Sequence, residues 1–430
     1  MALLTLSSIS GVRGGVRARV IKKLCISYIL LLFIPVPLQA LEVNTAIENA
    51  LSLGDNSKYG QLKFDIRYRY EYVYTSDNSP IKTANANTLR LRLGYLSPEL
   101  YSLQTYIEYA GNLAMQEDFN SLQNGLTGYE TIVDPQAQEL NQFWLSYKAI
   151  PGTLLKGGRQ RINLDNERFI GSVSWRQLEQ TFDSLLIRNQ SIENLTLNFI
   201  YIGGVQKVTA TNQTVEMPIL NFTYKFGQSS SLTGYAYWLA DYDTASNSTQ
   251  TYGVRMQGAP TLKYDIQLSY DIAYSNQSSY RHNPASYNLD RYNLLLGASY
   301  AGVTVKSGIE LLGGNGMQAF QTPLGTNHAF QGWADQFLVT PGAGVRDIQA
   351  SIDKSFYGVK FMFAYHAFAD SSGHGDYGDE YDFLISKHFG EHYQLLAKYA
   401  YYDADNTLAA AKAGVDKNTQ KIWVQGSVSF

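Results

Sequence analysis

The 430-residue chain carries 34 basic and 37 acidic residues, for a formal charge of −3, and its mean hydropathy is −0.22. This balance argues against general nucleic-acid binding, which needs a basic domain. It also argues against a helical membrane protein, because no run after residue 40 approaches the roughly 18 apolar residues of a spanning helix. The single cysteine, Cys25, lies near the N-terminus, so the rest of the chain has no thiol for cysteine catalysis, a zinc–thiolate site or a disulfide.

Residues 1–40 have the features of a secretory signal peptide. Five bases and no acid precede an apolar run from Leu24 to about Val36, which is too short to span a bilayer. Leu38-Gln39-Ala40 is a small-residue cleavage site, although the apolar run could alternatively serve as a membrane anchor. Cleavage would leave 29 bases against 37 acids, a formal charge of −8, with residues 41–60 as a polar periplasmic tail.

Alternating polarity predicts β-strands through the rest of the chain. In the first strand, 62–74, aliphatic and aromatic residues occupy every even position and charged residues occupy most odd positions. Charges opposite aromatics suit a wet lumen on one side and a lipid face on the other. The eighteen predicted strands are 62–74, 88–95, 101–109, 140–148, 153–163, 184–189, 195–205, 217–226, 231–240, 250–257, 263–274, 291–300, 303–312, 346–352, 356–368, 380–387, 393–402 and 419–430.

The connections between these strands alternate between short and long. The short ones are 97–99, 149–152, 190–194, 227–230, 301–302 and 388–392, and the long ones are 75–87, 110–139, 164–183, 241–249, 275–290, 313–345, 369–379 and 403–418. Outer-membrane barrels have short periplasmic turns and long extracellular loops. We therefore predict an all-β fold, a transmembrane antiparallel β-barrel over residues 61–430, in the lipid of a Gram-negative outer membrane. The alternative, a soluble all-β protein, would need more than one core, and no linker divides the chain.

The last predicted strand, 419–430, alternates strictly and ends in an aromatic residue, Phe430. It resembles the C-terminal strand of bacterial outer-membrane barrels, which the barrel-assembly machinery recognises. We therefore expect that machinery to be a partner of this chain.

Residues 157–183 contain more charge than a strand pattern requires. Arg159 and Arg161 share one face of the predicted fifth strand. An arginine fork binds carboxylates bidentately and keeps its charge in a confined site, so the segment predicts a selectivity filter for a carboxylated solute. The alternative is a salt-bridge network that only plugs the mouth. The predicted constriction consists of Arg159, Arg161, Arg168 and Arg176, with Asp165, Glu167, Glu179 and Asp183 as their partners.

Two stretches resemble the alginate export family of outer-membrane proteins. They are GGRQRINLDNERFIGSVSWRQLEQTFDSLLIRN at 157–189 and HAFQGWADQFLVTPGAGVRDI at 328–348, within a resemblance that runs from roughly 60 to 430. The resemblance implies an eighteen-stranded monomeric barrel that exports an acidic polysaccharide through an arginine-lined constriction.

The parity of the strands predicts a basic lumen, and positive rings select anions in pores. Alternatively, inward arginines and acids pair across neighbouring strands and leave little net field. The predicted solute pathway contains Arg67, Arg69, Arg90, Arg92, Arg159, Arg161, Arg168, Arg176 and Arg188. The same parity places Lys63, Arg255, Lys263, Arg291, Lys306 and Lys360 inside, with Asp65, Glu71, Glu108, Asp265, Asp271, Glu310 and Asp382 as the inward acids.

These features predict passive diffusion of a uronate-type, alginate-like saccharide, with uptake of small anionic solutes as the alternative. We expect no enzyme, because no histidine stands beside a Gly-x-Ser-x-Gly elbow and no HExxH occurs. His374, Asp376, Asp379 and Glu380 could bind a divalent cation, but a solvated acidic loop fits them better. We therefore expect no metal and no cofactor.

Overall fold

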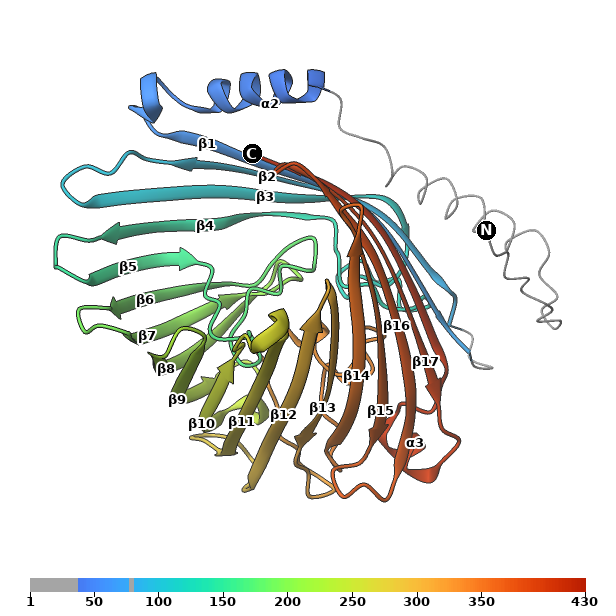
Figure 1. Cartoon of the computed structure of the whole chain (residues 1–430). Helices are drawn as coiled ribbons and strands as arrows, with labels where there is room; N and C mark the ends of the chain where they lie inside the picture. The colour runs from blue at the N-terminus through green and yellow to red at the C-terminus, as the bar shows by residue number, and fades with distance from the viewer. Residues whose placement is uncertain (1–37, 77–80) are drawn as a thin grey trace.

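The computed structural model describes residues 38–76 and 81–430, which form a closed ring of antiparallel strands (Figure 1). Each strand pairs with the next one along the chain, and β18 pairs with β1 to close the ring. Closure removes the exposed edges that an open sheet would present. The predicted signal peptide, residues 1–40, lies almost entirely outside the described residues and stays a prediction.

All eighteen predicted strands are confirmed. They are β1 Gln61–Thr75, β2 Ala84–Leu96, β3 Leu103–Asp118, β4 Ala137–Tyr147, β5 Thr153–Gln160, β6 Thr181–Asn189, β7 Leu195–Gln206, β8 Asn212–Phe226, β9 Ser230–Asp241, β10 Thr249–Gly258, β11 Gln267–Ser279, β12 Asn288–Tyr300, β13 Val303–Leu312, β14 Val345–Phe356, β15 Val359–Ala369, β16 Asp376–Phe389, β17 Tyr393–Ala404 and β18 Thr419–Ser429.

Most strand boundaries differ from the prediction by a few residues, and three of the differences affect the argument below. Strand β3 begins after Tyr101 and Ser102, whose φ angles of 51° and 63° place them in a left-handed turn. Strand β5 ends at Gln160, so the next residues leave the wall and enter the lumen. Strand β11 begins at Gln267, after the 3-10 turn η3 Lys263–Asp265, so Lys263 and Asp265 do not face the lumen from a strand as predicted.

The short and long connections gather at opposite ends of the barrel, which we call the short-turn end and the long-loop end. The long-loop end carries the longest connections, 119–136, 161–180 and 313–344. Two connections depart from the rule, since 207–211 is short at the long-loop end and 259–266 is long at the short-turn end.

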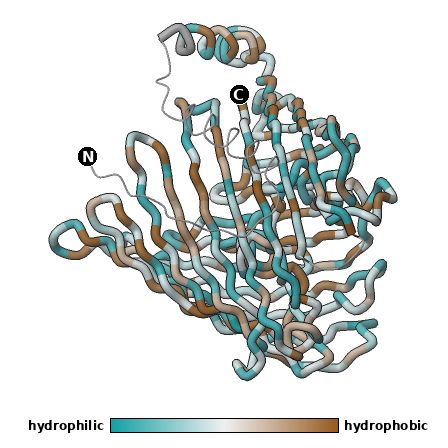
Figure 2. Tube along the Cα trace, turned by 90° about the vertical axis from the view of Figure 1, so that its right-hand side faces the viewer, coloured by the Kyte–Doolittle hydropathy of each residue, from teal (hydrophilic) through white to brown (hydrophobic). Residues whose placement is uncertain are grey.

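The two faces of the wall have inverted polarity compared with a soluble protein. Ile66 and Tyr68 are each 37% exposed on the outside of β1, whereas Arg69 and Glu71 are 0% and 1% exposed on the inside. Figure 2 shows the resulting alternation of hydrophobic and hydrophilic residues along the strands. This pattern is typical of a wall between lipid and a polar interior.

Helices occupy the two ends of the barrel. α2 Leu38–Leu51 and the 3-10 turn η1 Asp55–Ser57 precede β1, where the sequence suggested only a polar tail. Tyr393 donates its hydroxyl to Asn44 of α2 at 2.7 Å, which fixes the helix at the short-turn end. The short 3-10 turns η2 Ala245–Asn247 and η4 Asn327–Ala329 and the helix α3 Leu408–Ala413 lie in long-loop connections. No helix in residues 38–76 or 81–430 is long and apolar enough to cross a membrane.

Phe430 is expected to govern assembly, because it completes the seam between β18 and β1. Its backbone N–H and C=O both bond to Phe64, at 2.9 and 3.1 Å, and its ring stacks on that of His392 with centroids 3.9 Å apart. Deleting Phe430 should leave most of the chain unfolded in the periplasm, measured as loss of the heat-modifiable band in outer-membrane fractions. The control is Phe356→Ala, which removes an exposed ring at the last residue of β14, also at the short-turn end of the barrel. Equal surface yields of the two variants would contradict this role.

Candidate functional site

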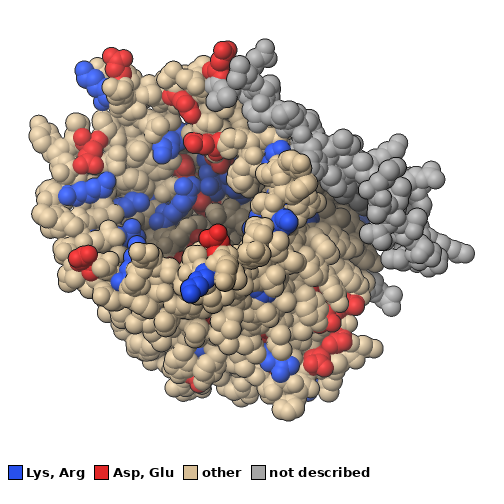
Figure 3. Space-filling model, viewed as in Figure 1, with Lys and Arg blue, Asp and Glu red and all other residues tan. Residues whose placement is uncertain are grey.

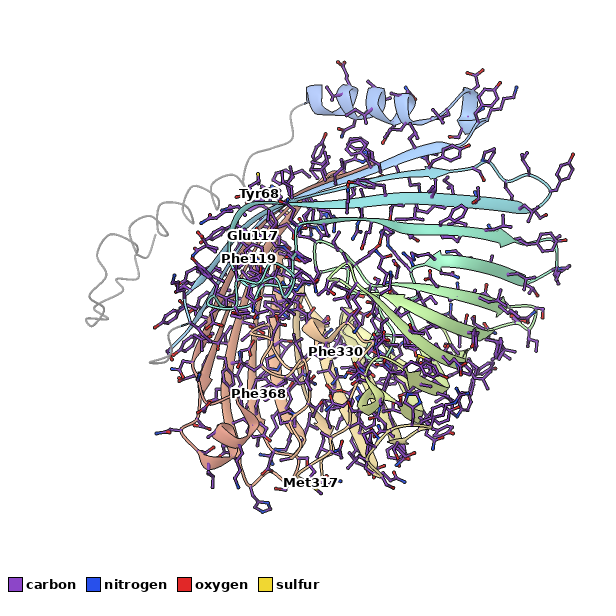
Figure 4. The ribbon with its side chains drawn as sticks, turned by 180° about the vertical axis from the view of Figure 1, so that it is seen from behind. Tyr68, Glu117, Phe119, Met317, Phe330 and Phe368 are labelled. Carbon is purple, nitrogen blue, oxygen red and sulfur yellow. The ribbon has the colours of Figure 1, made fainter. Side chains whose placement is uncertain are left out.

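Two of the long connections, 161–180 and 313–344, fold together inside the barrel, and we call them the plug. Gly171 donates its N–H to Leu324 O at 3.0 Å, and Thr326 donates to Glu167 O at 2.9 Å. Figure 4 shows Phe330, from the second connection, inside the ring of strands. The parts of the two resembling segments that leave the wall, 161–180 and 328–344, therefore lie side by side in the lumen.

Arg176 is the residue that joins the first plug segment to the wall and to the other long loops. Its guanidinium lies 3.2 Å from Glu71 of β1, 3.7 Å from Asp134 of the 119–136 connection and 3.4 Å from Asp335 of the second plug segment. All four side chains are buried. Burial opposes the charge of Arg176, but the three carboxylates outweigh it and raise the pKa of the guanidinium above its ordinary value.

Two predicted pathway arginines on β1 bind the plug itself. Arg67 Nη1 donates to the carbonyl oxygens of Ser174 and Trp175, at 3.0 and 3.2 Å. Arg69 donates to Trp175 O at 2.5 Å, and its guanidinium carbon lies 4.1 Å from the centre of the Trp175 ring. These contacts hold the plug against β1.

A second buried arginine, Arg168, anchors the plug to the opposite part of the wall. Arg168 Nε donates to Glu310 of β13 at 3.0 Å, and Arg291 of β12 donates to the same carboxylate oxygen at 2.6 Å. Gln331 of the second plug segment accepts from Arg168 at 2.9 Å. Burial lowers the pKa of Arg168 despite the carboxylate of Glu310.

A third charged cluster lies where β5 meets the plug, on the short-turn side. Arg161 contacts Glu179 and donates to Glu108 at 2.9 Å. Arg92 lies 3.2 Å from Glu179, and Asn141 donates to the same residue at 2.6 Å. Of the four constriction arginines that the sequence predicted, only Arg161 contacts Glu179 among the described residues, and its second partner, Arg92, was predicted for the solute pathway.

Arg159 does not share this cluster, which corrects the expectation that Arg159 and Arg161 lie on one lumen face. Arg159 pairs bidentately with Asp183, at 2.8 Å for each bond, and sits opposite the exposed Phe143 in the ladder. The cause is the end of β5 at Gln160, because Arg161 lies beyond the strand and no longer follows its alternation. The Asp183 pairing itself agrees with the prediction.

The other two predicted acids have no arginine partner among residues 38–76 and 81–430. Asp165 accepts from Asn221 at 3.0 Å, and burial raises its pKa. Glu167 accepts from Thr326 at 2.6 Å. The prediction that both pair with the constriction arginines is wrong, because the folded plug turns them toward neutral donors.

A buried lysine of the wall forms a contact that the sequence did not indicate. Lys398 of β17 lies 3.7 Å from the centre of the Trp333 ring and 4.2 Å from that of Trp175. It donates to His328 Nε2 at 2.9 Å, while His328 Nδ1 donates to Asp335 at 2.6 Å. Burial lowers the pKa of His328 to about 3, so the ring is neutral at pH 7 and can make both bonds.

Two recesses open on the inner wall at the short-turn end. The first, of about 550 Å³, lies between β8 and β13, and the second, of about 430 Å³, lies between β1 and β5. Figure 3 shows lysine and arginine side chains gathered around the hollow of this face. The lumen-facing cations of the described part of the chain for which no ion pair with an acid is formed include Lys63, Arg67, Lys156, Arg188, Lys225 and Lys306. The plug arginines Arg168 and Arg176, by contrast, pair with acids, as the alternative of mutual charge pairing expects.

Metal-ligating side chains are dispersed. Within residues 38–76 and 81–430, no group of three or more histidine, cysteine and acidic residues could hold a metal ion. His374 instead lies 3.1 Å from the hydroxyl of Ser372 in its exposed connection.

Replacing Arg176 with Gln is expected to lower the free energy of unfolding by about 3–5 kcal/mol, because three carboxylates would stay buried without their cation. Reversible unfolding in lipid vesicles, followed by tryptophan fluorescence, measures this change. The control is Arg281→Gln, which breaks an exposed pair with Glu216 and should change stability little. A shift for R176Q no larger than that of the control would show that the ion cluster does not support the fold.

Comparison with known proteins gives the family and the fold. The model of the alginate export family matches residues 58–311, which include the resembling segment 157–189 and end before the segment 328–348. The fold is similar to that of OccAB2 of Acinetobacter baumannii, with a TM-score of 0.68 and 16% identity over 86% of this chain and 98% of that one. It is also similar to that of OpdK of Pseudomonas aeruginosa with vanillate, with a TM-score of 0.63 and 12% identity over 86% of this chain and 99% of that one. At these identities the likeness shows the fold alone.

No curated protein matches the chain in sequence. The family match covers more than half of the chain, and the similar barrels include an outer-membrane protein of Pseudomonas aeruginosa. The family and the fold indicate a channel rather than an enzyme. The chain belongs to the alginate export family of outer-membrane β-barrels.

Proposed function

We propose that this barrel lets an anionic saccharide of uronate type, such as an alginate-like oligomer, diffuse across a Gram-negative outer membrane. The observation that carries the proposal is the set of lumen-facing cations without an acid partner, at and near the short-turn mouth. A carboxylated solute entering there would exchange part of its hydration for contacts with ammonium and guanidinium groups. The family match supports a saccharide as the cargo.

The acids near the same mouth are already engaged by arginines of the wall. Arg90 Nε donates to Asp65 at 3.1 Å, and Arg255 pairs with Asp271 through bonds of 2.8 and 2.6 Å. These pairs are close to neutral, so the remaining lysines set the sign of the local field. In a narrow polar channel, wall charge of one sign concentrates ions of the other sign.

The constriction that we propose is formed by fewer arginines than the sequence suggested. It lies between the plug and the wall, where Arg92 and Arg161 border the open recess. Arg67, Arg69, Arg168 and Arg176 act as its scaffold, because their guanidinium groups bind the plug or hold it to the wall.

Several properties of the channel belong to this proposal. We propose a single-chain barrel that folds through the assembly machinery by means of its last strand and uses no cofactor. Catalysis is not part of the proposed role.

A second candidate is uptake of small anionic solutes, and one observation favours it. A barrel with a TM-score of 0.63 to this chain was solved with vanillate, which is a small carboxylate. Block of single-channel current discriminates the two roles, since a saccharide channel should be blocked by an oligouronate at far lower concentration than by vanillate.

The parent channel is expected to prefer chloride over potassium in reversal-potential measurements across a salt gradient. Replacing Lys63, Lys225 and Lys306 together with Gln should shift the reversal potential toward zero selectivity, because three uncompensated charges leave the lumen. The preference should weaken toward 1 M salt, where the screening length falls to about 3 Å.

The matched control is Lys354→Gln, which removes a lysine from the outward register that it shares with the exposed Ile352. Its selectivity should equal that of the parent. A parent channel that prefers potassium would contradict the proposed function.

A further inference from the structure

The second recess differs from the first by the side chains that line it. It opens at the short-turn end beside the starts of β1 and β3 and the end of β18, and it holds about 430 Å³. Its lining includes Lys63, Arg92, Lys156, Arg161 and the aromatic pair Tyr106 and Trp144. Trp144 and Tyr106 are in contact, with ring centroids 5.7 Å apart.

Arg92 is a buried arginine that lines this recess and still has unused donors. Its side chain is 8% exposed, and only Nη1 reaches a carboxylate, that of Glu179 at 3.2 Å. Its Nε and Nη2 are buried without an acceptor among the described residues. Buried donors without a partner are costly, and a carboxylate oxygen is the acceptor that a guanidinium binds best.

Lys156 supplies a second cation that is held in place but not neutralised. Its ammonium lies 4.0 Å from the centre of the Trp144 ring. No acid of the described chain forms an ion pair with it. Stacking over an aromatic face orients an ammonium without cancelling its charge, so Lys156 can still receive an anion.

The two acids of the recess are unavailable as competitors. Glu108 accepts from Tyr106 at 2.6 Å, from Asn141 at 2.6 Å and from Arg161 at 2.9 Å. Asp65 is held by Arg90 at 3.1 Å. Their lone pairs are largely used, so an incoming carboxylate meets the ammonium groups of Lys63 and Lys156 and the unused donors of Arg92.

We infer that this recess is a binding subsite for one carboxylated sugar unit, loaded from the short-turn end. The carboxylate lies between Arg92 and Lys156, and the amides of Gln104 and Gln142 border the space for ring hydroxyls. The plug covers the other side, where Arg161 and Glu179 join it to the wall. The inference rests on the proposed function and adds to it a place and a side of entry for the cargo.

Single-channel recording with a short oligouronate tests the subsite. The parent channel should be blocked more often when the oligouronate is added to one chamber than to the other, and a neutral oligosaccharide of equal length should not block. Lys156→Gln should lower the association rate of block from the favoured chamber about tenfold, because a charged contact is lost. Lys156→Arg, which keeps the charge, should restore most of that rate.

The matched control is Lys306→Gln in the first recess, which removes the same charge from a recess without a tryptophan. It should lower anion selectivity as much as Lys156→Gln does but change the association rate less than about twofold. Lys63→Gln is the second test within the recess and should lower the rate as well, and heat-modifiable migration verifies that each variant is folded.

Equal rates of block for Lys156→Gln, Lys63→Gln and Lys306→Gln would overturn the subsite while leaving an anion-selective channel. A parent that is blocked equally from both chambers would overturn the side of entry. Cation selectivity of the parent would instead refute the proposed function itself.

Discussion

The arrangement of the lumen depends on one interaction, the burial of Arg176 among Glu71, Asp134 and Asp335. These carboxylates come from a wall strand and from two long connections, so a single guanidinium fixes three parts of the chain. Carboxylates buried this closely would repel each other without the cation. The plug therefore stays inside the barrel, because its withdrawal would take Arg176 away from these carboxylates and leave the buried charges without their partners.

The wall of the barrel separates lipid on its outer face from water and polar groups on its inner face. Its outer face buries apolar side chains in lipid, so its hydrophobic residues cannot also build a large core inside. The interior is consequently held by ion pairs and hydrogen bonds at Arg176 and Arg168, with a smaller apolar cluster where Phe182 and Ile200 face the plug residue Ile170. Because most of the lumen arginines serve this scaffold, the charges left for a solute are mainly lysines at and near the short-turn mouth.

Alternation along the chain predicted all eighteen strands, because one lipid face and one polar face impose a period of two residues. Arg159 was misplaced because it was assigned the phase of Arg161, which lies beyond the end of β5, and the same assignment hid the inward position of Lys156. The inward phase of Glu71 and Glu310 was visible, but their partners were not. Asp134 and Asp335 lie in connections, where no alternation indicates which way a side chain points. Asp165 and Glu167 were predicted to pair with arginines only because they lie in the same charged segment, and proximity in sequence did not determine their partners.

Hydrogen exchange of the plug amides in the folded barrel tests the central claim most directly. The N–H groups of Gly171 and Gln177 bond to Leu324 O and Asp134 Oδ1 at 3.0 and 2.8 Å. The account predicts that they exchange as slowly as amides of β1, because they open only when the ion cluster breaks. Exchange as fast as that of Gln228, in an exposed turn, would show that the plug is not held in the lumen and would contradict the account.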